Sequence, residues 1–151
     1  NKKVSDAYLH NHPYTVAITL MGSPIFFQET HYYTKEAKDE IKPVIATYKQ
    51  HRDEMYQGFV FPIGEKPSNK SWSGFQNYNP ETNTGYLTIF REINNDVSNK
   101  KMKLHFIKDA TLILTNLMTG TTEEKIIKSD GTIDFEIPKP ANFRFYKYEI
   151  K

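Results

Sequence analysis

The first third of the chain combines a continuous apolar run with a periodic amphipathic stretch. Tyr14–Met21 (YTVAITLM) is almost entirely apolar, a pattern typical of a strand that is buried on both faces. Gly22, Ser23 and Pro24 end this run, because glycine and proline interrupt regular structure. The pattern therefore predicts a buried strand followed by a loop rich in aromatic residues.

Apolar positions from Ile41 to Tyr56 recur at steps of three and four residues, which indicates one face of a helix. Pro43 lies near the start of this stretch, where a missing N–H is least costly, so we expect the regular helix to begin there. Gly58 follows the last periodic residue and is expected to end the helix in a left-handed conformation.

From Phe59 onward the apolar positions alternate with period two, and turn residues separate the alternating segments. Ile133, Phe135 and Ile137 share one face, whereas Asp134 is expected to be exposed. Met102, Leu104 and Phe106 are likewise expected to share a face, and Asp130-Gly131 predicts a hairpin. The eight predicted strands are Phe59–Ile63, Ser71–Asn77, Gly85–Glu92, Lys101–Lys108, Thr111–Leu117, Glu124–Lys128, Thr132–Ile137 and Phe143–Ile150.

These segments predict a mainly β chain: an antiparallel β-sandwich of about eight strands, of Greek-key type, over residues 59–151. Residues 1–58 precede it as one strand and one long amphipathic helix. A lone strand and helix cannot close a core of their own. This unit must therefore pack on the sandwich or belong to a larger domain, and its apolar faces could also cause self-association through residues 14–56.

The composition excludes several classes of function. The chain has 151 residues, and its 20 Lys and Arg against 18 Asp and Glu give a formal net charge of +2 with interspersed signs. This balance argues against a nucleic-acid partner, and no apolar run is long enough to predict a membrane span. Cysteine is absent, which excludes thiol catalysis and disulfides. The 14% of aromatic residues favours strands and surfaces that bind sugars.

Few residues suggest catalytic or ligand-binding chemistry. His10 and His12 flank one residue and could share a metal, but no third ligand is placed, so neither a metal nor another cofactor is predicted. Glu29 is the loop carboxylate closest to the aromatic segment. Trp72, the only tryptophan, could stack on a sugar ring or could fill the core of the sandwich, as Tyr86, Phe90, Phe143, Phe145 and Tyr148 are expected to do.

Three segments carry a resemblance to a known family: Gly58–Pro67 (GFVFPIGEKP), Ser71–Gln76 (SWSGFQ) and Gly85–Glu92 (GYLTIFRE). They resemble the C-terminal region of α-galactosidase-like glycoside hydrolases, which are retaining enzymes with a (β/α)₈ barrel followed by an antiparallel β-sandwich. The resemblance assigns Tyr14–Met21 to the eighth barrel strand and Ile41–Tyr56 to the eighth barrel helix.

The resemblance implies that this chain alone is inactive, because the nucleophile and the acid/base of such enzymes come from earlier barrel strands. It implies a carbohydrate substrate for the parent enzyme and the rest of the barrel as partner. Because active sites form at the carboxyl ends of barrel strands, the candidate substrate contacts are Phe26, Phe27, Gln28 and Glu29, with Trp72 as a separate candidate. The alternative is a freestanding carbohydrate-binding or interaction β-sandwich module.

Overall fold

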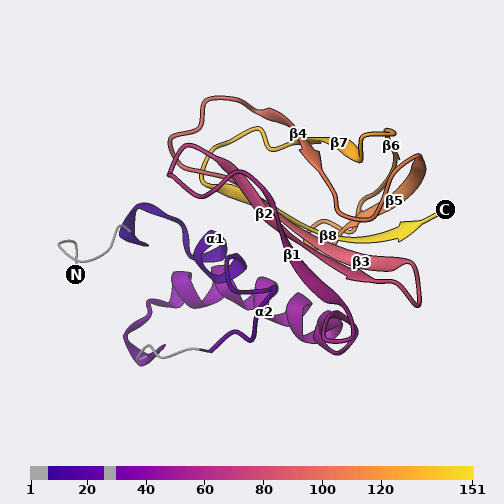
Figure 1. Ribbon diagram of the computed structural model, residues 1–151. Coiled ribbons are helices and arrows are strands. Elements are labelled where there is room, and N and C mark those ends of the chain that lie inside the picture. The colour runs from indigo at the N-terminus through magenta and orange to yellow at the C-terminus, as the bar shows by residue number, and fades with distance from the viewer. Residues whose placement is uncertain (1–6, 26–29) are drawn as a thin grey trace.

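The computed structural model describes residues 7–25 and 30–151 and has three layers, with helices on one side of a large sheet and a small sheet on the other (Figure 1). Within these residues the elements are η1 (Ala7–Leu9), α1 (His12–Ala17), η2 (Thr30–Tyr32), α2 (Lys35–Met55), β1 (Phe59–Gly64), β2 (Trp72–Asn79), β3 (Thr84–Arg91), β4 (Asn99–Lys103), β5 (Ala110–Asn116), β6 (Thr122–Ile127), β7 (Thr132–Glu136) and β8 (Asn142–Ile150). No helix in this part of the chain is long and apolar enough to cross a bilayer.

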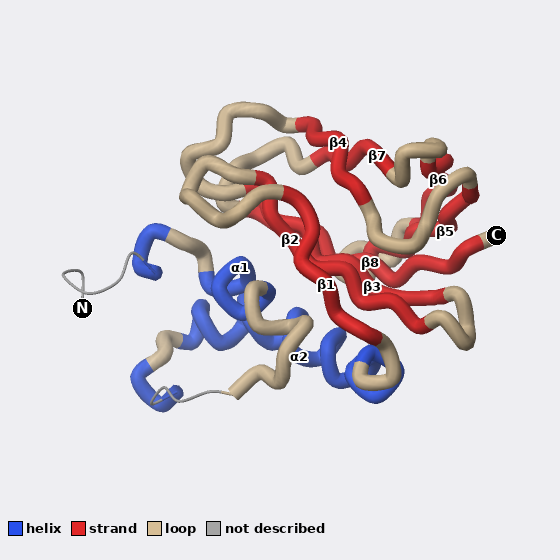
Figure 2. Tube along the Cα trace, viewed as in Figure 1, coloured by secondary structure: helices blue, strands red, loops and turns tan. Residues whose placement is uncertain are grey.

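Both sheets are antiparallel. The large sheet has the order β1-β2-β3-β8-β5-β6, and β4 pairs with β7 in the small one. The last strand, β8, thus lies between β3 and β5, so the end of the chain is held inside the large sheet (Figure 2). The predicted mainly β fold is confirmed, and each of the eight predicted strands corresponds to an observed one.

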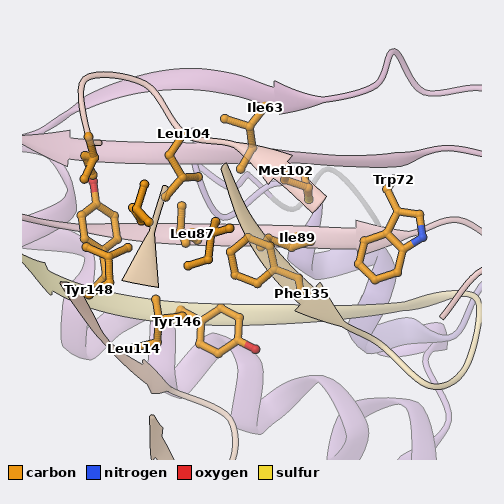
Figure 3. Close-up of a cluster of buried hydrophobic side chains, with 14 of the residues drawn as sticks. Ile63, Trp72, Leu87, Ile89, Met102, Leu104, Leu114, Phe135, Tyr146 and Tyr148 are labelled. Carbon is orange, nitrogen blue, oxygen red and sulfur yellow. The ribbon is translucent and has the colours of Figure 1, made fainter. Parts of the chain in front are cut away.

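The space between the two sheets is filled by large apolar side chains, several of them fully buried (Figure 3). Ile133, Phe135 and Ile137 all point into this core and Asp134 is exposed, as predicted. Trp72 is fully buried here as well, and its indole N–H donates to Asn95 Oδ1 at 3.1 Å and to the Val97 carbonyl at 3.0 Å. A buried tryptophan with a satisfied N–H is stable in a core.

A second core joins the helices to the outer face of the large sheet. Its buried members come from both sides of the contact: Tyr14, Ala17, Leu20, Val44, Tyr48, Met55, Tyr86, Phe90, Phe143 and Phe145. The expected core positions of the last four are confirmed, as is that of Tyr148 in the first core. The helical layer, meaning η1, α1, η2 and α2, therefore packs on the sandwich through one shared apolar core.

The prediction of a strand over Tyr14–Met21 is wrong, because the chain forms α1 there and then turns to Gly22. The Asn11 side chain caps the helix by accepting from the Tyr14 N–H at 2.8 Å, and Pro13 lies in the first turn, where it is well tolerated. Tyr14, Ala17 and Leu20 are buried at three-residue spacing. The apolar run thus has helical rather than strand periodicity.

The predicted helix is confirmed, but both of its ends differ. It begins at Lys35, with Thr34 as N-cap, and Pro43 lies inside it on the exposed side, where water can hydrate the carbonyl that loses its partner. Gly58 does not have a positive φ. Instead, Asn77 Nδ2 donates to the Met55 carbonyl at 2.8 Å, and a Cβ on Gly58 would lie 2.6 Å from Asn77 Oδ1. The glycine therefore provides space for a side-chain cap.

Two predictions about the β region also need correction. The predicted strand over Lys101–Lys108 ends at Lys103, and Phe106, with φ 63°, is 71% exposed rather than buried beside Leu104. The turn at Asp130-Gly131 forms, with Gly131 at φ 81°. However, the strands on either side of it belong to different sheets, so this turn connects the sheets rather than closing a hairpin.

Candidate functional site

The open side of the helical layer is the candidate functional surface. Among the described residues, eight of the eleven exposed large hydrophobic side chains belong to residues 8–60. Leu9 is 51% exposed, Ile18 48% and Ile25 69%, although Ala17 and Leu20 of the same segment are fully buried. We call Leu9, Ile18 and Ile25, together with the cavities beside α1, the α1 surface. Its apolar side chains lie next to polar ones, since His12 and Thr15 of α1 are exposed as well.

Three cavities adjoin α1 and the residues after it. One of about 510 Å³ lies between α1 and the ends of β1 to β3 and includes Tyr14, Ile63 and Phe90 in its lining. A second of about 370 Å³ is lined by Ile18, Val60 and other residues of the turn after α1. A third of about 340 Å³ lies between Leu20 and α2. Folded proteins pack densely, so α1 has fewer neighbours than an ordinary core helix.

The largest of these three cavities contains a buried carboxylate. Glu92 is 5% exposed and accepts from the Ser68 and Ser71 N–H groups at 3.0 and 2.8 Å and from Ser73 Oγ at 3.3 Å. These bonds fix the loop between β1 and β2. Burial, together with the charge of Glu92, raises the pKa of Tyr14 to about 12, so this hydroxyl stays protonated at neutral pH.

Two tyrosine hydroxyls meet at the far end of α2. Tyr48 Oη and Tyr56 Oη lie 2.7 Å apart. Burial, with the hydrogen bond to Tyr56, raises the pKa of Tyr48 to about 12, whereas hydrogen bonds from Tyr48 and Ser23 lower the pKa of Tyr56. The hydrogen bond between Ser23 and Tyr56 connects the turn after α1 to the end of α2, and the Tyr56 ring is 58% exposed.

A fourth cavity, of about 790 Å³, lies between α2 and the β5, β6 and β8 strands. Glu40, Glu123 and Glu136 line it, and all three are exposed. Glycoside hydrolysis needs two carboxylates, one of which burial keeps protonated as the general acid. The exposed carboxylates of this cavity lack that environment, which disfavours a catalytic role for them.

Of the substrate contacts predicted from sequence, the structure describes Trp72. Phe26, Phe27, Gln28 and Glu29 lie outside the described residues. Trp72 is enclosed in the sandwich core and offers no face to a sugar.

The two candidate metal ligands, His10 and His12, contact different partners. The His10 ring stacks on Tyr14 with centroids 5.0 Å apart, while His12 Nδ1 contacts Glu40 Oε2 at 3.0 Å. No group of three His, Asp or Glu side chains suited to a metal occurs among residues 7–25 and 30–151.

Sequence reasoning missed a polar network that attaches α2 to the large sheet. Tyr86 Oη donates to Glu54 Oε2 at 2.7 Å, and Lys147 Nζ donates to the same oxygen at 2.9 Å. His51 Nδ1 lies 3.2 Å from Tyr86 Oη. Partial burial opposes ionisation of Glu54, but these hydrogen bonds prevail and lower its pKa. Burial and then the charge of Lys147 lower the pKa of His51.

Comparisons with known proteins returned no match: no family model, no curated protein and no solved structure matches this chain.

Proposed function

We propose that this chain forms the C-terminal, non-catalytic part of a sugar-cleaving enzyme, a retaining glycoside hydrolase similar to the α-galactosidases. In this proposal the helical layer completes the catalytic barrel, and the sandwich packs against the opposite side of that layer. The observation that carries the proposal is the α1 surface, where exposed apolar side chains and cavities of about 510, 370 and 340 Å³ surround one short helix. Further elements of a larger domain would fill such space.

The proposal requires a different assignment of the barrel elements. Because Tyr14–Met21 is not a strand, it cannot be the eighth barrel strand, and in the proposal α2 remains the candidate for the last barrel helix. Each helix of a (β/α)₈ barrel follows a strand. The last barrel strand would therefore come from outside Tyr14–Met21, and Phe26, Phe27, Gln28 and Glu29 stay candidate substrate contacts.

The catalytic carboxylates would come from parts of the barrel outside this chain, so we assign no catalytic residue here. The purified 151-residue chain is expected to release no p-nitrophenol from p-nitrophenyl α-galactoside above a heat-denatured control. A protein extended upstream to include a complete barrel, about 250 residues, is expected to release it. Turnover by the short chain would contradict the proposal, as would an extended protein inactive on a panel of aryl glycosides.

The role of the α1 surface can be tested separately with two matched variants of the extended protein. Ile18→Lys places a charge on the α1 surface, and Ile126→Lys places one on β6, where Ile126 is 77% exposed. We expect Ile18→Lys to lower kcat/KM by about tenfold or more, since burying an unpaired charge is costly. Ile126→Lys should leave it unchanged. Equal activity of both variants would show that nothing packs on this surface.

The alternative of a freestanding sugar-binding module rests on the aromatic content and the sandwich pattern, and it cannot use Trp72 as its stacking ring. Trp72 is fully buried and both of its indole hydrogen bonds are made inside the protein. The burial of Trp72 therefore favours a supporting role for the sandwich core over a binding role at this position.

A further inference from the structure

The loop between β4 and β5 displays one aromatic side chain in a strained conformation. Phe106 has φ 63°, and its side chain is 71% exposed. A non-glycine residue is unfavourable in the left-handed region, and an exposed phenyl ring adds apolar surface to water. Strained backbone of this kind is concentrated at functional sites, where the surrounding structure holds it in place. Phe106 is not part of the sandwich core, so core packing compensates neither its backbone strain nor its exposed ring.

The surrounding structure holds this loop firmly. The fully buried Gln76 of β2 clamps His105 twice: Gln76 Oε1 accepts from the His105 N–H at 2.7 Å, and Gln76 Nε2 donates to the His105 carbonyl at 3.1 Å. On the two sides of this clamp, Leu104 and Ile107 are buried in the core. Phe106 is thereby forced outward, so its position is determined before any ligand arrives.

Neighbouring aromatic rings pack against the exposed ring of Phe106. Phe61 packs edge-to-face against Phe106 with centroids 5.1 Å apart, and Tyr78 lies roughly parallel to it at 6.0 Å. His105 completes the group, with its Nε2 at 3.0 Å from the Pro62 carbonyl. A ring buttressed on several sides has few conformations to lose on binding, which favours affinity. We call Phe61, Tyr78, His105 and Phe106 the aromatic platform.

A cavity of about 350 Å³ adjoins Phe106, and its lining identifies the chemistry of a ligand. Besides the phenyl ring it includes Lys103, Lys108, Ser129 and Asp130, all of them exposed. Asp130 is held in place because its Oδ1 accepts from the Thr132 N–H and hydroxyl at 2.9 and 2.6 Å. One flat apolar face beside amino, hydroxyl and carboxylate groups matches a pyranose, which has an apolar C–H face and a rim of hydroxyls.

We propose that the aromatic platform and the adjoining cavity form a carbohydrate-binding site, in which a sugar ring stacks on Phe106 and its hydroxyls bond to Asp130, Ser129 and the two lysines. The site is built on the sandwich alone and does not depend on the role proposed for the α1 surface. Asp130 repels a phosphate group, whereas the hydroxyls of a neutral sugar can donate to this carboxylate and accept from Lys103 and Lys108, so a polysaccharide can use all the polar groups of the cavity.

The test is affinity electrophoresis of the purified chain in native gels that contain galactomannan, xyloglucan, mixed-linkage β-glucan or arabinogalactan. We expect at least one polysaccharide to retard the chain. Phe106→Ala should weaken this binding by about tenfold or more, because the stacking face is lost. Phe106→Trp should preserve it, and the control Ile126→Ala, which removes an equally exposed apolar side chain from β6, should leave it unchanged.

Phe106→Gly distinguishes a binding role of Phe106 from a role in stability, because the two roles predict opposite changes in Tm and in polysaccharide binding. Glycine accepts a positive φ without strain, so this variant is expected to raise Tm while it abolishes retardation. The proposal is overturned if none of the four polysaccharides retards the chain, if Phe106→Ala binds like the wild type, or if only a single-stranded oligonucleotide retards it. None of these outcomes bears on glycosidase activity, so the two proposals fail separately.

Discussion

The two faces of the large sheet are covered in different ways. On the inner face, β4 and β7 enclose a core in which Trp72, Phe135 and Leu112 have almost no exposed surface. On the outer face, α1 and α2 also bury apolar side chains, but cavities lie on both sides of α1 and Ile18 and Ile25 are open to water. The core between the two sheets thus consists of nearly fully buried side chains, whereas the helical layer that covers the outer face leaves apolar side chains exposed and cavities beside α1.

This difference suggests that the sandwich and the helical layer differ in local stability. Local stability follows the number of buried apolar contacts, and regions with fewer contacts open at lower free energy. We therefore expect the sandwich to unfold last and the helical layer to open first. The four predictions below test this ranking, beginning with the largest expected effect.

Trp72→Ala should destabilise the whole chain most, because it removes the largest fully buried side chain of the inner core. Truncations of this kind cost about 3–5 kcal/mol of unfolding free energy. Urea unfolding followed by far-UV circular dichroism measures this loss. A cost below about 1 kcal/mol would mean that the inner core does not dominate the stability of the chain.

Leu20→Ala should cost less, about 2 kcal/mol, although Leu20 is only 1% exposed. Its neighbours already border a cavity of about 340 Å³, so fewer contacts are lost. Hydrogen exchange should show faster exchange in α1 and α2 with the strands unchanged. If the strands lose protection to the same degree, the two layers unfold as one unit and the comparison fails.

Acidification should loosen the helical layer before the sandwich. The pKa values of His51 and Glu54 are both lowered in the folded state, so the unfolded chain binds more protons as the pH falls through either group. Their contribution to stability is present at neutral pH and is lost stepwise, first below the ordinary pKa of histidine, about 6.5, and then below that of glutamate, about 4.3.

Glu54→Gln provides the matched variant for this pH dependence. It keeps the shape of the side chain but removes the charge that accepts from Tyr86 and Lys147, and it should cost about 1 kcal/mol at pH 7. The variant should also lose the lower of the two steps in a plot of Tm against pH. Retention of that step would assign it to other carboxylates.

Ile18→Lys should have the smallest effect on folding and the clearest one on association. Ile18 is half exposed, so a charge there costs less than about 0.5 kcal/mol of stability. If the helical layer self-associates through residues 14–56 at high concentration, this substitution should shift sedimentation toward the monomer, and Ile126→Lys should not. Equal sedimentation of both variants would exclude the α1 surface from such contacts.

The sequence predicted the strands well because alternation is a local signal. Ile133, Phe135 and Ile137 reveal their common face within five residues, and no distant partner is needed. Tyr14–Met21 was misassigned because an apolar run of this length is compatible with a strand or a helix. The distinguishing signal was local too, namely Asn11 as N-cap with Pro13 in the first turn.

The candidate sites could not be predicted in the same way, since they depend on contacts between distant residues. Phe106 follows the alternation of Met102 and Leu104, and only the clamp by Gln76, 29 residues away from His105, turns it outward. Glu54 likewise meets Lys147 across 93 residues. Periodicity reports which side chains prefer burial, but it carries no information on which partner will enforce or override that preference.

The join between α2 and β1 has a consequence for the whole molecule. Asn77 holds the last turn of α2 through the Met55 carbonyl, and Gly58 leaves no room for even a methyl group beside it. This close contact adds to the shared apolar core and the Glu54 network in fixing how the helix meets the sheet. Enlarging residue 58 would displace the Asn77 amide and break its hydrogen bond to the Met55 carbonyl, so the junction between α2 and the sheet would loosen.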